Sequence, residues 1–282
     1  MRVTSTRDVR GGWRFLRTLG CVATLTISLS GCLTVPTAET DAMVAATEQI
    51  ESDTLLAQLN AAEKQLLIKH ANPGPSGFNP DDAALYATLD TYAPATGRFH
   101  AALTILKDYA ALIKSLVEGQ AATAQANAIK TTVDNISTLG AVAPQIAAQV
   151  TAIDAVVGAF TPVVAKALTI RTQAQARDLV AQGAKPVRET ITALRNATPA
   201  MFVLLMAAGN AQSSGSAPDR GKARVALSNY VVLLDRLQET FDKLNDAFQH
   251  RSNSISAVAL AQSTGELAAD VKIVQQAFAS LK

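Results

Sequence analysis

The sequence predicts an all-α protein, an elongated antiparallel bundle of about five to seven long helices. The chain is rich in alanine and only 5% aromatic, a composition that favours close packing of helix against helix. Apolar residues recur at alternating spacings of four and three, as they do along the buried seam of a bundle or coiled coil. No segment combines β-branched enrichment with sustained period-two alternation, which is the pattern of a strand.

Four stretches carry this heptad pattern, and we call them the heptad seams. The first runs from Leu85 to Val117, the second from Ile146 to Val164, the third from Leu227 to Phe248 and the fourth from Leu267 to Leu281. Pro94 falls within the first seam. Because proline removes a backbone donor and clashes with the preceding turn, we expect Pro94 to start a new helix or to kink this one.

Turn-forming residues divide the helices from one another. Breaks are expected at residues 72–80 and 210–221, and weaker ones at 140–144, 183–186 and 198–199. The predicted helices cover residues 40–70, 81–118, 120–139, 143–182, 186–210, 218–250 and 254–281. Glycine inside a helix costs only about 1 kcal/mol. Gly119 is therefore compatible with a continuous helix, and continuity near residues 119 and 140 is left open.

The first part of the chain has the composition of a signal peptide. Five arginines, the first Arg2 and the last Arg17, precede an uncharged run over residues 18–30. A basic segment followed by an apolar segment of this length is typical of an export signal. The apolar run is too short to span a bilayer as a mature helix.

The run ends in Leu29, Ser30, Gly31 and Cys32. This tetrapeptide resembles the lipobox of bacterial lipoproteins. The resemblance covers the first 32 residues, and it implies that Cys32 is acylated and becomes the N-terminus once the leader is removed. It also implies a lipid-anchored protein of the cell envelope. Leu33 after the cysteine, rather than aspartate, implies delivery to the outer membrane, facing the periplasm. The alternative is an ordinary secretory leader with a chance cysteine.

The expected cleavage divides the chain into a signal peptide (1–31), a short lipidated tether (32–39) and a helical bundle domain (40–282). Residues 1–31 hold five arginines and one aspartate, so their removal changes the formal net charge from +2 to −2. A mature chain of this charge is not expected to bind nucleic acid. Cys32 remains as its only cysteine. A lipidated cysteine forms no disulfide, so packing alone must hold the fold.

The sequence contains no recognisable catalytic motif and predicts neither a cofactor nor an enzyme. His70, His100 and His250 are isolated from one another and from cysteine. The metalloprotease, nucleophile-elbow, phosphate-loop and dinucleotide-binding patterns are all missing from it.

One acidic stripe merits separate consideration. Asp235, Glu239, Asp242 and Asp246 follow one another at spacings of four, three and four, and so share one helix face. Dinuclear metal sites in bundles need a Glu-x-x-His pair on each of two helices. The mature sequence contains no such pair, so we predict no metal site and interpret the stripe as a solvated or interaction face.

A smaller basic cluster is formed by Arg220, Lys222 and Arg224. It could hold a phosphate or a lipid headgroup. A solvated loop is the favoured interpretation, because Asp219 lies beside it.

Two stretches carry almost no charge. Residues 139–165 contain a single charged side chain, Asp154, and residues 199–209 contain none. Insertion into a membrane needs about 20 predominantly apolar positions. Polar residues dilute the first stretch and the second is short, so we expect helices buried on most sides within the bundle.

These observations favour an interaction or adaptor module at the cell envelope, with a protein partner that the sequence does not identify. Two alternatives stay open. One is a membrane-active bundle that uses the apolar region 139–211. The other is a carrier of a small apolar ligand, held between helices by Phe99, Tyr109 and Met201.

Overall fold

The structure is a computed structural model, and it describes residues 37–51, 54–70, 92–142, 146–170, 172–211, 219–249 and 254–281. The chain divides into two compact units, Met1–Leu33 and Thr34–Lys282, and every described residue belongs to the second. Cys32 and the rest of the lipobox, the predicted loop at 72–80 and His250 lie outside the described residues.

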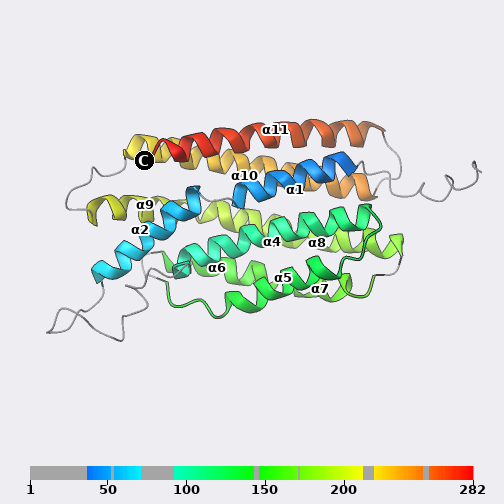
Figure 1. Cartoon of the computed structure of the whole chain (residues 1–282), viewed down its shortest axis with the longest axis horizontal. Coiled ribbons are helices and arrows are strands. Elements are labelled where there is room, and N and C mark those ends of the chain that lie inside the picture. The colour runs from blue at the N-terminus through cyan, green and yellow to red at the C-terminus, as the bar shows by residue number, and fades with distance from the viewer. Residues whose placement is uncertain are drawn as a thin grey trace, which may run out of the picture. The chain divides into compact units, whose positions relative to one another are not determined.

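The described residues form ten helices and no strand, which confirms the prediction of an all-α fold (Figure 1). The helices are α1 (Thr37–Glu51), α2 (Thr54–His70), α4 (Pro94–Val117), α5 (Thr123–Ile136), α6 (Ala147–Gly158), α7 (Thr161–Ala167), α8 (Gln173–Asn196), α9 (Thr198–Ala211), α10 (Arg220–Gln249) and α11 (Ser254–Ala279).

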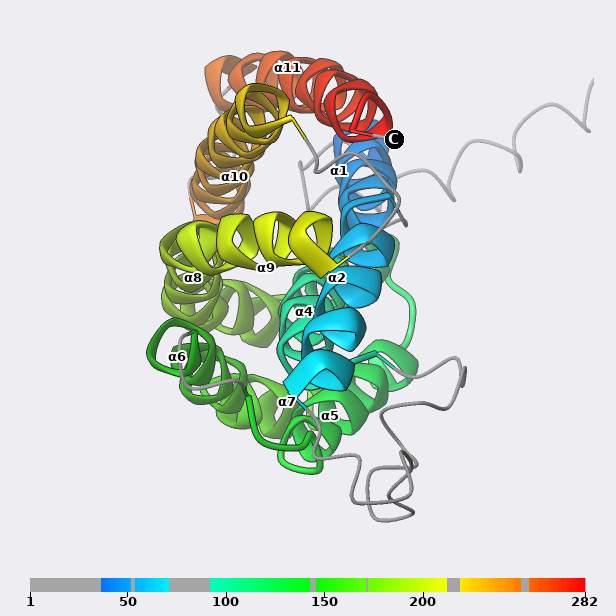
Figure 2. The ribbon, with the colours of Figure 1, turned by 90° about the vertical axis from the view of Figure 1, so that its left-hand side faces the viewer.

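Helices α4 and α8 lie between two groups of helices (Figure 2). On one side α10 packs against α8 and α11, and α11 and α4 both contact α1. On the other side α5, α6 and α7 pack against α4 and α8. Helix α9 follows α8 and lies against α2 and α10. The two central helices therefore contribute to the packing of both groups.

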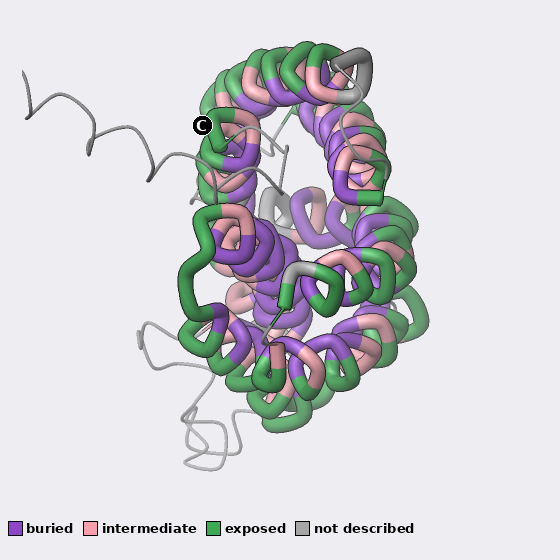
Figure 3. The backbone as a smooth tube through the Cα atoms, turned by 90° about the vertical axis from the view of Figure 1, so that its right-hand side faces the viewer, coloured by how far each residue is buried: buried purple, intermediate pink, exposed green. Residues whose placement is uncertain are grey.

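The heptad seams point into this bundle, as predicted. Figure 3 shows the buried residues along the inward sides of the helices. Phe99, Val157, Leu234 and Val271, one from each seam, are all buried. The periodicity of the sequence therefore gave the correct helix phase in the described part of all four seams.

Pro94 starts α4, which confirms one of the two roles expected of it. Side chains of α2 satisfy the first backbone donors of this helix. The Oδ1 atom of Asn60 accepts from the Ala93 amide at 2.8 Å. The buried carboxylate of Glu63 accepts from the amides of Ala95 at 2.7 Å and Thr96 at 2.8 Å. Two residues more than thirty positions upstream thus cap α4.

The sequence left open whether the helices near residues 119 and 140 are continuous, and the structure shows a break at both places. Gly119 has a φ of +68°, a left-handed conformation that glycine adopts without strain, and α4 ends just before it. Helix α5 is therefore separate. A second break follows Ile136, the last residue of α5, and α6 begins only at Ala147.

The predicted helix at 143–182 is wrong, because the chain breaks twice within it. Residues 159–160 form a turn between α6 and α7, with Pro162 in the first turn of α7. Helix α8 then starts with a capping box in which Thr172 and Gln175 satisfy each other's backbone amides. The heptad seam gave no sign of the first break, because Phe160 within the turn and Val164 after it both stay buried.

The expected break at 183–186 is also wrong, since both Gly183 and Pro186 lie inside α8. Gly183 faces the ring of Tyr109, and a Cβ at this position would lie 2.5 Å from Tyr109 Cζ. The glycine therefore serves the packing of α4 against α8. Pro186 removes the donor for the carbonyl of Gln182, which is an exposed residue.

Two further predicted helices, 40–70 and 186–210, differ from the structure. The predicted helix at 40–70 is two helices, and α1 begins at Thr37, within the segment predicted as tether. The predicted helix at 186–210 is likewise wrong, because α8 continues to Asn196. The break at 198–199 is confirmed, since α9 starts at Thr198 after a turn at Ala197.

Candidate functional site

The acidic stripe of α10 contacts α8. Asp235 lies 3.3 Å from Arg195, and Asp242 lies 2.8 Å from Arg188, measured between the charged N and O atoms. These pairs cross from α10 to α8, so the two carboxylates orient one helix on the other. All four side chains are half-exposed, and such pairs contribute little to stability one by one.

Glu239, the second carboxylate of the acidic stripe, pairs with basic residues of its own helix. Glu239 accepts from Lys243 at 2.8 Å and from Arg236 at 2.9 Å. The hydrogen bond from Lys243 is the main reason that the pKa of Glu239 lies below its usual range. Arg236 also reaches Glu266 on α11 at 2.6 Å.

Among the residues that the structure describes, no group of three metal-ligating side chains is found.

Of the three histidines, the structure describes the side chain of His100 alone. His100 on α4 is half-buried, with its ring centroid 4.5 Å from that of Tyr92. His70 is the last residue of α2.

Asp154, the single charge of residues 139–165, pairs with Arg98. Arg98 Nε lies 2.9 Å from Asp154 Oδ1, and Arg98 also donates to the carbonyls of Pro94 at 3.0 Å and Gly140 at 3.1 Å. The guanidinium group is buried between α4 and α6, while the carboxylate is about one-third exposed. The apolar face of α6 is thus packed in the bundle, and its charge has a basic neighbour.

Two stretches nevertheless have the length and apolar composition of a membrane-spanning helix. They are Ala147–Ala167 and Ala174–Ala207, and in the apolar 18-residue window of each, 33% and 50% respectively of the residues are buried inside the bundle. The first contains the turn between α6 and α7, and the second contains the turn between α8 and α9. Apolar helices within a soluble bundle have the same composition.

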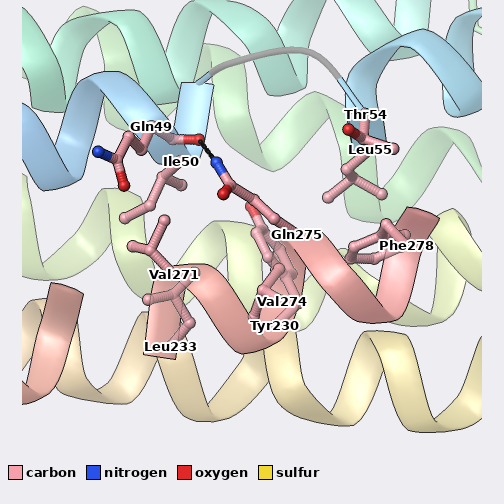
Figure 4. Close-up of a pocket in the computed structure, with 10 residues that line it drawn as sticks. All are labelled: Gln49, Ile50, Thr54, Leu55, Tyr230, Leu233, Val271, Val274, Gln275 and Phe278. Atoms are coloured by element: carbon pink, nitrogen blue, oxygen red, sulfur yellow. Dashed lines mark hydrogen bonds between the residues drawn. The ribbon is translucent and has the colours of Figure 1, made fainter. Parts of the chain in front are cut away.

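The interior pockets near the buried tyrosines are small. One is shown in Figure 4, where Tyr230 of α10 lies beneath Gln275 and Val274 of α11. Its volume is about 20 Å³, room for roughly one water molecule. The Tyr230 hydroxyl has no hydrogen-bond partner among the described residues, and burial raises its pKa. We therefore interpret this pocket as a hydration site rather than a ligand site.

The second interior pocket bears on the predicted ligand carrier. Tyr109 lines a cavity of about 10 Å³, and its hydroxyl donates to the carbonyl of Val180 at 3.2 Å. Phe99 and Met201, the other two residues expected to line a carrier pocket, are fully buried and do not line this cavity. Neither of these two pockets brings the three residues together.

A different surface, on α9 and the start of α10, is open to solvent. Helix α9 is uncharged throughout. Its side chains Met201, Leu204 and Leu205 are buried against the bundle, whereas Phe202 and Met206 are half-buried and Val203 is 45% exposed. A helix that is apolar on every side is normally buried on every side. Helix α9 departs from this rule, because its outer face is open to solvent. We had expected the helix at residues 199–209 to be buried on most sides.

Two arginines border this face. The guanidinium carbon of Arg224 lies 5.9 Å from the ring centroid of Phe202, and Arg220 lies one turn earlier on α10. Neither arginine has a carboxylate partner within 4.0 Å among the described residues. Asp219 accepts from the amide of Gly221 at 2.7 Å. We define Phe202, Val203, Met206, Arg220 and Arg224 as the α9–α10 surface.

The α9–α10 surface is hollowed. Its residues, together with Ala207, line an open cavity of about 380 Å³. In the sequence the arginines and the uncharged run are separate features, and the low charge of the run predicted a buried helix. The available signal was that α9 has more apolar positions than one buried face requires.

Comparison of the chain with models of known protein families, with curated proteins and with solved structures gives no match.

Proposed function

We propose that this chain is a lipid-anchored periplasmic protein that acts as an interaction module at the cell envelope, with the α9–α10 surface as its binding face. The anchor is the lipid on Cys32. The proposed role is non-catalytic, and it is supported by the acidic stripe, where Asp235 and Asp242 are engaged in ion pairs with α8.

The short distance between the anchor and the first helix supports this arrangement. Helix α1 begins at Thr37, five residues after Cys32. Five extended residues reach at most about 18 Å. The end of the bundle that carries the start of α1 is therefore held near the membrane.

The α9–α10 surface lies at the other end of the bundle. Lys114, near the end of α4, pairs with Asp41, near the start of α1. Helix α10 begins at the opposite end, beside the last residues of α11 (Figure 1). Its 30 residues span about 45 Å. An anchored molecule would thus hold this surface away from the membrane and toward partners in the periplasm.

The observation that carries the binding role is the outer face of α9. Val203 is 45% exposed beside the half-buried Phe202 and Met206, and these three residues line one cavity with Arg220 and Arg224. Single exposed aliphatic residues are common on soluble proteins, but apolar side chains grouped beside cations that pair with no described carboxylate are typical of an interaction site.

Photocrosslinking in living cells tests this proposal. A photoreactive phenylalanine analogue would replace Val203 in the full chain, and in a matched control it would replace Ala121. Ala121 is also exposed, but it lies in the turn after α4, at the end that carries the start of α1. We expect a protein adduct of discrete mass from position 203 and none from position 121.

The adduct should depend on the arginines as well. Arg220→Glu combined with Arg224→Glu reverses the charge of the rim without touching the core, and it should abolish the adduct. An adduct of equal yield from both positions, or one that the charge reversal leaves unchanged, would argue against this binding face.

A further inference from the structure

We propose that the α9–α10 surface binds an anionic amphiphile, a compact anion joined to a single apolar chain. The inference rests on the proposed function in one respect, namely that this surface is a binding face. It goes further in naming the chemistry of the ligand.

The arginines provide the site for the anion. Arg220 and Arg224 are exposed and lie on one side of α10, and neither forms an ion pair with a described residue. Guanidinium groups donate paired hydrogen bonds that match carboxylate and phosphate oxygens. Lys222 differs from them, because its ammonium group points to the carbonyl of Ser280 at 3.5 Å. The two arginines are therefore the cations available to a ligand.

The apolar part of the ligand would lie on α9. Phe202, Val203, Met206 and Ala207 line the same cavity as the two arginines. Arg224 lies over the Phe202 ring, and this contact places a cation directly beside the apolar floor. Charge at one end and aliphatic surface at the other are the two features that an amphiphile complements.

The volume of the cavity matches a small ligand, which occupies far less surface than a whole protein interface does. Its volume of about 380 Å³ falls in the range of roughly 300–1,000 Å³ typical of small-molecule sites. A stable protein interface buries about 800 Å² on each partner, contributed by some 20–30 residues. Six residues line this cavity, far fewer than such an interface uses.

A fluorescence titration tests the proposal. The protein would be the mature chain from residue 32 with Cys32→Ser, which retains the whole compact unit 34–282. The probe is dansylaminoundecanoic acid, whose emission rises in an apolar site. We expect saturable binding, and displacement by both dodecanoate and monododecyl phosphate. Dodecanol, which has the same chain and no charge, should compete at least about tenfold more weakly, because it lacks the charge-assisted hydrogen bonds.

Variants locate the binding. Arg220→Gln with Arg224→Gln should weaken probe binding at least about tenfold, and Phe202→Ala should weaken it several-fold. The matched control is Lys272→Gln, which removes an exposed cation from α11. It should change the dissociation constant less than twofold. All of these side chains except Phe202 are exposed, so the helical circular dichroism should be unchanged.

Three results would overturn the proposal: no saturable binding, equal competition by dodecanol, or equal binding by the double arginine variant. Preference for dodecanoate over the phosphate would identify a fatty acid as the ligand, and the reverse would identify a lipid phosphate. A photoadduct at position 203 without probe binding would refute the ligand class but leave the binding face standing. Probe binding without any adduct would support the ligand and count against a protein partner.

Discussion

Arg98 Nε lies 2.9 Å from Asp154 Oδ1, so that the one charged residue of helix α6 is neutralised by a buried arginine of helix α4. The same guanidinium group donates to the carbonyls of Pro94, the first residue of α4, and of Gly140, which follows α5. One side chain therefore joins three segments of the bundle.

Removing Asp154 should destabilise the fold. Asp154→Ala leaves a largely desolvated guanidinium without its carboxylate, and breaking a fully buried pair in this way costs about 3–5 kcal/mol. Because Asp154 is about one-third exposed, we expect roughly 2 kcal/mol in the free energy of unfolding, measured in urea. Asp134→Ala is the control, since its pair with Lys130 is exposed, and it should change this free energy by less than about 0.5 kcal/mol. Similar losses in the two variants would contradict the structural role of Arg98.

The same pair makes a prediction about the membrane-active alternative. An ionised side chain near the middle of an inserted helix costs about 2.5–3.5 kcal/mol on insertion scales. In the bundle Asp154 is already paired. The mature chain with Cys32 replaced should therefore be soluble and helical, and it should release no dye from zwitterionic or anionic vesicles at micromolar concentration. Dye release by this protein would instead support the pore-forming interpretation of residues 139–211.

Gly183→Ala should destabilise the protein although it improves the intrinsic helix propensity of α8. The added methyl group would overlap the phenol of Tyr109, which is fully buried between α4, α8 and α10 and has little freedom to move. Overpacking of this kind costs about 1–3 kcal/mol. The measurement is again the free energy of unfolding.

Gly265→Ala provides the matched control for that substitution. Gly265 also lies inside a helix, but a Cβ there meets nothing within 4 Å. Alanine should stabilise this position by up to about 1 kcal/mol. Changes of the same sign at the two glycines would show that packing against Tyr109 does not govern position 183.

The anchor prediction depends on Cys32 alone. Cys32→Ala should yield an unlipidated protein that is washed from the envelope fraction, because a single acyl-modified cysteine is the only predicted attachment. Cell fractionation with metabolic labelling by a palmitate analogue measures both properties. A Cys32→Ala protein that has lost its leader and still sediments with membranes would contradict the lipoprotein interpretation.

Local patterns in the sequence predicted the helix phase well and the helix ends less well. The third seam predicted a buried Leu234 and Phe241, and both are buried, because the phase of one helix depends only on its own spacing. The turn before Thr161 was not predicted, because Phe160 within the turn is buried and continues the apolar spacing of the seam. Gly183 was misread as a break because its role depends on Tyr109, 74 positions upstream.

The candidate site was also predictable only in its local features. The basic residues and the uncharged run were each visible in the sequence. Their proximity was not visible, because the contact of Arg224 with Phe202 depends on how α10 packs against α9. The single charge of residues 139–165, Asp154, was likewise visible in the sequence, but its partner Arg98 lies 56 positions away.

The capping of α4 by Asn60 and Glu63 has a practical consequence for labelling. These side chains fix the start of α4 to the body of α2 through hydrogen bonds of 2.7–2.8 Å, so the spacing of the two helices does not depend on the length of the chain between them. The free energy of closing a loop rises only by about 0.6 kcal/mol for each doubling of its length. An epitope or a fluorescent peptide inserted between residues 71 and 91 should therefore leave the bundle intact and serve as a reporter on the folded protein.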